Sequence, residues 1–458
     1  MLTTRPGSSK QPCDATSGRD ASPRQRYYLI LISGDFNMMP ARYLGRGLTA
    51  CVLLTVSMTQ ACGQFGGEPL GEGPWEVATE LGTVHVSVLA DGLESPWSLV
   101  FVPDGDMLLA ERTGQLRVLR DGVLDPVAID GLPDMAIVGI SGLFGVALHP
   151  EFASNRLIYF AYPKERPGDP EALSLAVSRA RWDGGDSLSD VEELFVAQDW
   201  YSPAMAAEND RCCGQGPSTG SFGARVTFDD EGMLYVSSGD RNWGERSQDP
   251  QSHLGKILRL NDDGSVPDDN PFIDNDDYLP EIYTLGHRNQ TGMRFDAQTG
   301  VLWSTEFGPA GGDELNRIEA GGNYGWMVVT NGMHYDGNGG ELGTNGVDGF
   351  IDPVTWWPNG GNPGNLDVYH GALFPGWEDN VFVATMSGRR MSPGLVRIVI
   401  DAHGNAVHEE RMLTELGTRM RDVVAGPDGK LYVLTEAGPF ASPGVVLVLE
   451  PGAGFTPN

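Results

Sequence analysis

Three polar residues occupy a recurring position in the sequence, just before an apolar segment that a turn then reverses. Arg288, His370 and Arg421 each precede such a segment in the C-terminal half of the chain. Guanidinium groups bind carboxylates in a two-pronged geometry. If the three segments line one channel, the residues converge at one end of it and form an anion pocket. The alternative is that each residue caps its own strand independently.

The apolar segments belong to a unit of strand, turn and strand that recurs along the chain. Its copies are Ser98–Ala110, Gly145–Ala161, Ala224–Val236, Gly292–Trp303, Gly371–Ala384 and Asp422–Val433. Pro presets φ and Gly permits positive φ, so the turns reverse the chain between antiparallel strands. A spacing of roughly 45 to 80 residues is typical of propeller blades with long insertions. The sequence predicts an all-β, six-bladed β-propeller over residues 81–458, with the first strand of each blade lining the channel.

The densest group of polar motifs lies between residues 249 and 335. It contains His253-Leu-Gly-Lys-Ile-Leu-Arg-Leu, Ile282-Tyr-Thr-Leu-Gly-His-Arg-Asn, Thr305-Glu-Phe-Gly-Pro-Ala-Gly-Gly-Asp-Glu-Leu-Asn and Gly321-Gly-Asn-Tyr-Gly-Trp. From about Glu94 to the C-terminus, and most specifically in these motifs, the chain resembles the glucose/sorbosone dehydrogenase family. Members of this family are soluble sugar dehydrogenases that use pyrroloquinoline quinone.

The resemblance implies this quinone, a planar tricarboxylate, as the cofactor. Arg288 and Asn289 match one pair of family residues that contact the quinone, and Arg419 and Arg421 match a second pair. The implied reaction is oxidation of the C1 hydroxyl of an aldose to a lactone, with hydride transfer to the quinone and an external electron acceptor. The cofactor supplies the redox chemistry and the protein supplies the positioning.

Calcium is the second cofactor that the resemblance implies. One calcium ion in the family bridges the quinone and two backbone carbonyls, which here belong to Gly308 and Pro309. Another uses a glutamate side chain and a tyrosine carbonyl, matched by Glu314 and Tyr324. Oxygen ligands of these kinds suit calcium. The alternatives are a strand-end hydrogen bond for Glu314 and core packing for the tyrosine segment.

Three positions depart from the family pattern. Ser221 stands where the family has its catalytic His, four residues before Arg225. A serine hydroxyl does not take up a proton near neutral pH without a base of its own. Ile140 replaces a Gln, and Ser387 replaces a Lys. His370 is the surrogate base that the sequence offers, with a structural, hydrogen-bonded histidine as the alternative.

Two functions therefore compete. The first is a sugar oxidoreductase that depends on calcium and the quinone. The second is a non-catalytic, calcium-stabilised propeller that binds a glycan or protein partner. The loss of His at position 221 favours the second function, whereas the retained arginine pairs oppose it. A hydrolytic propeller has little support, because no His/Asp constellation recurs at matching strand ends.

The composition limits the partners. The 458 residues carry a net charge of −31. Such acidity disfavours nucleic acid, whose phosphates would be repelled. It fits an exported protein or one that holds cations, and acidity that simply maintains solubility is the plainer explanation.

The N-terminal region predicts export. Residues 1–37 are polar and aperiodic, so they form a disordered leader or precede a true start at Met38. Residues 38–62 resemble a signal peptide, because basic residues precede the short apolar run Leu48–Met58. The predicted location is the periplasm, the outer membrane through a lipid anchor, or the exterior.

The cysteines leave alternatives open. Cys62, after a small residue, is a lipoprotein anchor or part of a plain secretion signal, and residues 63–80 predict a Gly-rich tether. Cys212 and Cys213 are adjacent, so a bond between them would be strained, and two reduced thiols are equally compatible with the sequence. No transmembrane span is predicted after the signal peptide.

Overall fold

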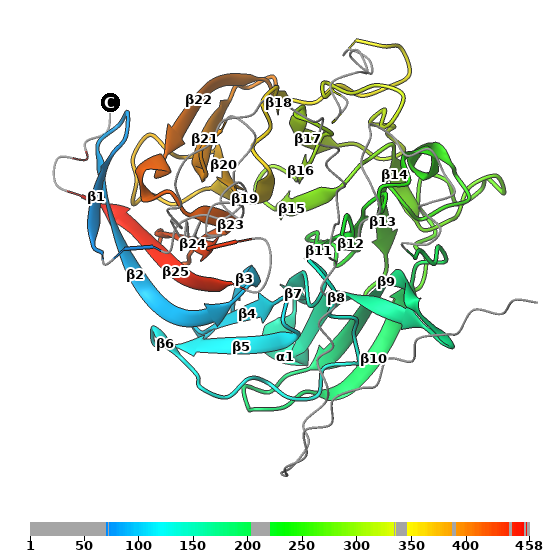
Figure 1. Ribbon diagram of the computed structural model, residues 1–458, viewed down its shortest axis with the longest axis horizontal. Coiled ribbons are helices and arrows are strands. Elements are labelled where there is room, and N and C mark those ends of the chain that lie inside the picture. Colours follow the sequence, from blue (N-terminus) through cyan, green and yellow to red (C-terminus); the bar gives the residue numbers. More distant parts are fainter. Residues whose placement is uncertain are drawn as a thin grey trace, which may run out of the picture. The chain divides into compact units, whose positions relative to one another are not determined.

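The computed structural model describes residues 70–71, 73–202, 220–333, 335, 346–386, 391–438, 442–452 and 455. Within these ranges the chain is nearly all strand, with a short helix α1 (Phe152–Asn155) and 3₁₀ helices at Gly244–Gln248 and Thr414–Leu416. Six antiparallel sheets surround a central axis as the blades of a propeller (Figure 1). The predicted six-bladed, all-β fold is confirmed.

Blades 1 to 5 each use four strands that are consecutive in the chain, the first of them innermost. Blade 1 contains β3 (Pro96–Phe101), β4 (Met107–Glu111), β5 (Gln115–Arg120) and β6 (Val123–Leu124). Blade 2 contains β7 (Val146–Leu148), β8 (Leu157–Arg166), β9 (Asp169–Arg181) and β10 (Ser189–Val196). Blade 3 contains β11 (Gly223–Phe228), β12 (Leu234–Ser238), β13 (Lys256–Leu260) and β14 (Ile282–Leu285). Blade 4 contains β15 (Gln290–Asp296), β16 (Val301–Glu306), β17 (Asp313–Ile318) and β18 (Thr355–Trp357). Blade 5 contains β19 (Pro363–Tyr369), β20 (Asn380–Thr385), β21 (Gly394–Ile400) and β22 (Ala406–Met412).

Blade 6 closes the ring by joining segments from both ends of the propeller sequence. Its strands, from the inside outward, are β23 (Arg419–Ala425), β24 (Leu431–Glu436), β25 (Pro443–Pro451), β2 (Thr83–Glu94) and β1 (Trp75–Ala78). The pairing of β25 with β2 runs from Val84 opposite Pro451 to Glu94 opposite Pro443. This pairing hydrogen-bonds strand edges that would otherwise be open. It also corrects the sequence prediction, because β1 lies inside the predicted tether of residues 63–80.

Each boundary between neighbouring blades has its own apolar cluster. Between blades 3 and 4, for example, Tyr235 and Ile257 pack against Met293 and Leu302. Because side chains alternate across a strand, each sheet contributes one set of apolar residues to each of its two neighbours. The core is therefore a ring of separate clusters, and the residues nearest the axis are free to be polar.

The predicted turns explain why strands follow one another so closely. Gly105, between β3 and β4, has a φ of +102°, and its N–H donates to the Val102 carbonyl at 2.9 Å. Gly429 repeats this arrangement between β23 and β24, with a φ of +81°. Glycine occupies these turn positions because it has no Cβ and adopts positive φ without steric cost.

The fifth repeat differs from its prediction. The segment Gly371–Gly376 was expected to be the first strand of its blade, but that strand is β19, which ends at Tyr369. The apolar residues of the segment instead contribute to packing. The Phe374 ring stacks on the Trp377 ring, with the two ring centroids 4.4 Å apart. An apolar run between turn residues does not by itself distinguish a strand from a buried loop.

Several predictions lie outside the described residues. These are the leader and signal peptide at residues 1–62, with Cys62, and the positions Cys212, Cys213 and Ser387. Within the described ranges, no helix has both the length and the apolar character needed to span a membrane.

Candidate active site

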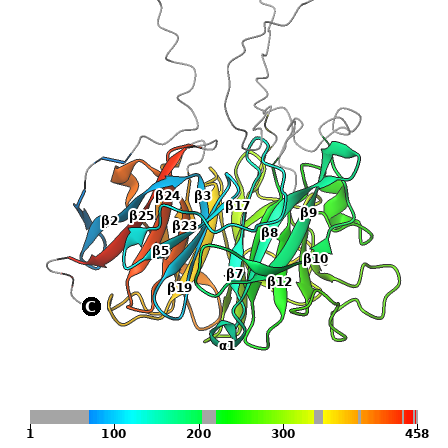
Figure 2. The ribbon, with the colours of Figure 1, turned by 90° about the horizontal axis from the view of Figure 1, so that it is seen from below.

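The inner strands all begin at the same end of the central channel, here called the upper end. At the start of β15, Thr291 donates its hydroxyl to the Pro363 carbonyl at the start of β19, at 2.6 Å. Helix α1, which follows β7, lies at the lower edge of the propeller in Figure 2. Residues that immediately precede inner strands therefore gather at the upper end.

Arg288 is buried at this end, two residues before β15. Its Nη1 donates to the Phe307 carbonyl at 3.1 Å, and its Nη2 donates to the Tyr335 hydroxyl at 3.3 Å. Its guanidinium lies 5.4 Å from the centre of the Trp326 ring. Burial alone lowers the pKa of Arg288, but the Tyr335 hydroxyl and nearby carboxylates outweigh burial and raise that pKa. Arg288 is therefore a permanent cation.

A cavity joins Arg288 to residues of the predicted metal site. It is lined by Arg288, Glu306, Phe307, Gly308, Gly312, Glu314, Tyr324, Trp326, Val329 and Thr330. Gly308, Glu314 and Tyr324 were named from the sequence as metal ligands, and Pro309 follows Gly308 in the same loop. A second cavity, lined by Trp357, Pro358, Asn359, Met391 and Arg411, contains none of the residues that the sequence singled out.

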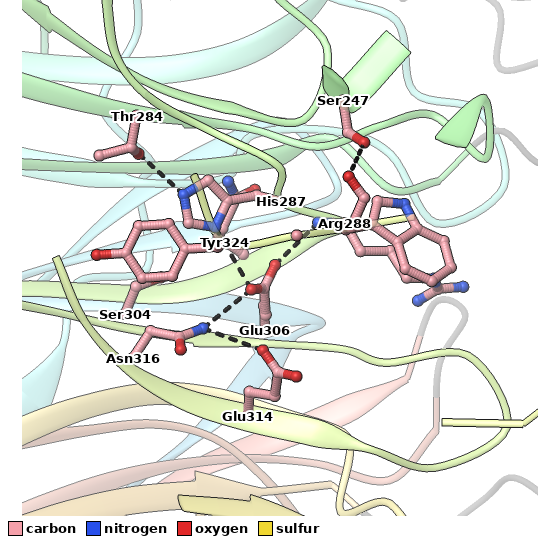
Figure 3. A network of polar contacts seen from close by, with 12 residues as sticks. Ser247, Thr284, His287, Arg288, Ser304, Glu306, Glu314, Asn316 and Tyr324 are labelled. Carbon is pink, nitrogen blue, oxygen red and sulfur yellow. Dashed lines mark hydrogen bonds and ion pairs between the residues drawn. The ribbon is translucent and has the colours of Figure 1, made fainter. Parts of the chain in front are cut away.

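Two acidic side chains of this cavity stand opposite each other. Glu306 on β16 pairs with Glu314 on β17, and the Asn316 side-chain amide donates to them at 2.9 and 3.3 Å (Figure 3). Burial first, and then the negative charge of Glu306, raise the pKa of Glu314 well above its ordinary value. A divalent cation beside the two carboxylates would offset both the desolvation of Glu314 and its repulsion by Glu306.

A buried histidine supports this pair from behind. His287 Nδ1 lies 3.4 Å from Glu306 Oε1, and its Nε2 lies 2.9 Å from the Thr284 hydroxyl (Figure 3). The His287 ring also stacks on the Tyr324 ring, with centroids 4.5 Å apart. The histidine thus fixes both an acidic side chain and an aromatic wall of the cavity.

Asp313 holds the loop that contains Gly308 and Pro309. Its Oδ1 accepts the Gly308 N–H at 2.8 Å, and its Oδ2 accepts two backbone N–H groups from the segment before β19 at 2.7 Å. Burial raises the pKa of Asp313 to about 6, although these three donors work in the opposite direction. A Cβ at Gly308 would lie 2.3 Å from the Gly311 carbonyl oxygen, so the loop path requires glycine.

Among the described residues, no group of three or more His, Cys, Asp or Glu side chains is arranged to hold a metal ion. A cation in this cavity would therefore depend on backbone carbonyl oxygens together with a few side chains. That donor chemistry is suited to calcium.

The second arginine pair gathers around a carboxylate that sequence reasoning missed. Arg419 donates to Glu436 Oε1 through Nε at 3.0 Å and through Nη2 at 2.9 Å, and Arg421 donates to the same oxygen. Arg112, from blade 1, donates to Glu436 Oε2 at 3.2 Å. Although burial works the other way, the charges of these arginines hold the pKa of Glu436 at about 2.

Ile140, at the position of the family Gln, lies beside this group. Its carbonyl accepts a hydrogen bond from Arg112 Nη1 at 3.3 Å, and 36% of the residue is exposed. The backbone of Ile140 therefore lies next to the arginines.

Ser221 and Asn289 also lie at the upper end. The Ser221 hydroxyl donates to Asn242 Oδ1 at 3.0 Å. Asn289 Oδ1 accepts the N–H of Gly223 at 3.0 Å, which ties the start of β15 to the start of β11. The side-chain oxygen of Asn289 is thus used to join two blades.

Asp240 is another buried carboxylate that the sequence analysis missed. It accepts hydrogen bonds from Trp326 Nε1 and from the Asn242 N–H, each at 2.8 Å. Burial raises the pKa of Asp240, against the opposing charge of Arg288. Asp240 and Asp313 both follow glycine next to a strand end, and this Gly-Asp pattern could have identified them.

His370 is not part of this site, which corrects the prediction that it begins an inner strand. It follows β19, so it lies at the lower end of the channel. Its Nε2 is 2.8 Å from Asp296, the last residue of β15, and its Nδ1 is 2.9 Å from Asp379. The misplaced fifth repeat caused the error, and the alternative of a structural histidine describes these contacts.

Comparison with known proteins agrees with this architecture. The chain is 36% identical over 361 residues to an aldose sugar dehydrogenase of Escherichia coli strain K12, which covers 77% of this chain and 90% of the relative. It is 26% identical over 428 residues to quinoprotein glucose dehydrogenase B of Acinetobacter calcoaceticus, covering 76% and 84% of the two chains.

Solved structures have the same fold. The apo form of the soluble aldose sugar dehydrogenase of Escherichia coli aligns with a TM-score of 0.71 at 33% identity, covering 81% of this chain and 100% of the other. The quinone-bound aldose sugar dehydrogenase of Streptomyces coelicolor aligns with a TM-score of 0.62 at 26% identity, covering 82% and 100%. The sequence model for glucose/sorbosone dehydrogenases matches residues 93–442. This match spans most of the propeller, and the chain belongs to the glucose/sorbosone dehydrogenase family.

Proposed function

We propose that this chain oxidises the C1 hydroxyl of aldose sugars to lactones, with pyrroloquinoline quinone and calcium as cofactors. The observation that carries the proposal is the cavity in which Arg288 lies beside Gly308, Glu314 and Tyr324. A buried cation and an oxygen-lined metal site are the two elements needed to hold an anionic quinone against calcium. The relatives named as aldose and glucose dehydrogenases support the same substrate class.

The residues at the upper end fit a planar tricarboxylate. Arg288, Arg419 and Arg421 offer guanidinium donors from two sides of the channel, and Asn289 follows Arg288. The Nε of Arg421 is buried, and it has no hydrogen-bond partner among the residues that the structure describes. Donors of this kind match the geometry of carboxylates, which the quinone carries.

The proposed calcium sites use the carbonyls of Gly308 and Pro309, the Glu314 side chain and the Tyr324 carbonyl. The opposition of Glu306 and Glu314 supports a cation here, because two carboxylates held side by side repel each other. Asp313 keeps the glycine–proline loop in place through its bond to the Gly308 N–H.

The chemistry that pyrroloquinoline quinone supplies when bound is acceptance of a hydride from the sugar C1. The protein must also provide for the proton of the C1 hydroxyl. Ser221 is a weak candidate for that task, because its hydroxyl already donates to the side chain of Asn242, and an amide is not a base that could activate it. His370 lies at the lower end and cannot reach a sugar bound beside Arg288. We therefore propose slow turnover compared with relatives that keep the His.

The Ser221 contact also favours a second candidate function. A propeller that retains calcium but lacks a base would bind a glycan or protein partner without oxidising it. The two candidates make opposite predictions for a titration with the quinone.

The test is reconstitution of the purified protein with calcium and pyrroloquinoline quinone, followed by absorbance before and after addition of aldoses. Quinone binding followed by sugar-dependent reduction supports the dehydrogenase. Replacement of Arg288 by Gln should weaken binding, whereas Arg411→Gln in the second cavity is the matched control. Calcium binding without quinone binding supports the second candidate, the non-catalytic binding propeller.

For the N-terminal region we propose export to the periplasm, with residues 38–62 as the signal peptide and Cys62 as a lipid anchor. Basic residues ahead of the apolar run Leu48–Met58 support this assignment. Cell fractionation with metabolic palmitate labelling of the full chain and of Cys62→Ser tests it. Labelled wild type and unlabelled variant support the anchor, whereas unlabelled wild-type protein in the periplasm indicates simple secretion.

A further inference from the structure

One carboxylate at the upper end is shared by three arginines from two blades. Glu436 ends β24, and it accepts hydrogen bonds from Arg419 and Arg421 at the start of β23. Arg112, which follows β4 of blade 1, completes the set. Glu436 is fully buried, and each arginine is at most 5% exposed. The group therefore spans the boundary between blade 6, within which the ring closes, and blade 1.

The charge of this group is strongly positive. Three guanidiniums meet one carboxylate, and Arg288 at the same end of the channel carries a further positive charge. Burial lowers the pKa of Arg421 to about 9, and the nearby charges of Arg112 and Arg419 add to that effect. Taking cations out of water is costly unless an anion compensates them. An anionic ligand beside the three arginines would therefore stabilise the group.

An aromatic ring holds the guanidiniums in a fixed arrangement. The Trp97 ring lies 4.3 Å from the Arg421 guanidinium and 5.9 Å from that of Arg112. Phe144 packs edge-on against the same ring, with centroids 4.8 Å apart. Cations that are fixed over an aromatic face and by one shared carboxylate lose little freedom when a ligand arrives.

We propose that Arg112 is a fourth guanidinium of the site for an anionic ligand. Glu436 is a positioning residue that holds the three guanidiniums of its own group. The ligand class is an organic carboxylate. Under the proposed function, on which this reading rests, the group that Arg112 binds is a carboxylate of the quinone. Arg112 comes from outside the residues that the family motifs identified, and it joins the site only through ring closure.

The experiment measures dissociation constants by fluorescence titration of the full chain in calcium, with pyrroloquinoline quinone and its uncharged trimethyl ester as probes. Arg112→Gln should weaken binding of the quinone about tenfold or more, because it removes a charge-assisted hydrogen bond. Its affinity for the ester should stay within about twofold, since the ester carries no carboxylate charge. Arg112→Lys should restore part of the loss. Arg120→Gln, a half-exposed arginine of the same blade paired with Asp106, is the matched control and should change neither constant.

The role of Glu436 has a distinct readout. If Glu436 only neutralised charge, Glu436→Gln would tighten quinone binding by leaving the arginines more positive. If Glu436 positions them, the variant binds the quinone more weakly despite the added charge. Where Glu436→Gln does not fold, the Arg112 series decides the proposal.

Trimesate, an aromatic tricarboxylate without redox chemistry, separates this inference from the proposed function. Thermal stabilisation by trimesate that disappears in Arg112→Gln supports the anion site even if the quinone does not bind. Quinone binding that Arg112→Gln leaves unchanged overturns the inference while the proposed function stands. Failure of wild-type protein to bind either probe overturns both.

Discussion

The Ser221 hydroxyl donates to Asn242 Oδ1 at 3.0 Å, at the position where the resemblance to the family predicts a catalytic histidine. Ser221 has a φ of +56°, in the left-handed region that histidine enters more readily than most residues. The backbone at this position therefore suits the residue that is missing.

Restoring that residue should raise the rate of sugar oxidation. We expect Ser221→His to increase kcat for aldose oxidation about a hundredfold or more, because general-base assistance is worth roughly 10² to 10⁴ in rate. Steady-state kinetics with quinone and calcium provide the measurement. Ser221→Ala is the control, and its rate should equal that of the wild type. A large loss in Ser221→Ala would mean that the hydroxyl itself takes part.

Calcium should stabilise the fold. At a free concentration of about 100 times its dissociation constant, a ligand bound only by the folded state adds about 2.7 kcal/mol. We expect the melting temperature to fall on chelation, and Glu314→Gln to lose most of this response. In chelator alone the Glu314→Gln variant should be at least as stable as the wild type, because it removes the charge repulsion between Glu306 and Glu314. The exposed Glu319→Gln is the control, and an equal calcium response in all three proteins would refute the site.

His370 should contribute to stability in a pH-dependent way. Burial alone lowers its pKa, but the hydrogen bonds with Asp296 and Asp379 outweigh burial and raise the pKa above 6.5. A raised folded-state pKa means that the contribution is complete below pH 6.5 and is lost as the pH rises through the folded-state value. We expect His370→Ala to be destabilised at pH 6 by on the order of 1–2 kcal/mol, and by less at pH 8.5.

The same variant tests the location of His370. Because the imidazole lies at the lower end of the channel, His370→Ala should bind quinone with unchanged affinity. Urea unfolding at the two pH values and quinone titration provide the measurements. A pH-independent loss of stability, or weaker quinone binding, would contradict this assignment.

Ring closure should be a major source of stability. Leu449 on β25 is fully buried, and it pairs with Val86 on β2 and with Leu431 on β24. Leu449→Ala should lower the free energy of unfolding by about 2–5 kcal/mol through loss of buried surface and a residual cavity. Val407→Ala, at a position 59% exposed on blade 5, should stay within about 0.5 kcal/mol. Similar urea midpoints for the two variants would show that the closing sheet contributes little.

The sequence by itself determined the architecture and named several residues that line one cavity with Arg288. Recurring turns with Pro, Asp and Gly are local signals, since φ at each turn depends on the residue that occupies it. They therefore predicted the number of blades before any contact was known. The motifs around Arg288, Gly308 and Glu314 likewise lie in one stretch of the chain, residues 288–314, so their shared location could be inferred from the sequence.

Only the tertiary structure decided how distant segments meet. The pairing of β2 with β25 brings Arg112 to Glu436, which lies 324 positions further along the chain. The packing of blade 5 against blade 4 places His370, just after inner strand β19, in contact with Asp296 of the neighbouring blade. Such contacts depend on register and on ring closure, which are set by the packing of all six blades together. No local pattern of residues encodes them, because the contacting residues lie far apart in the sequence.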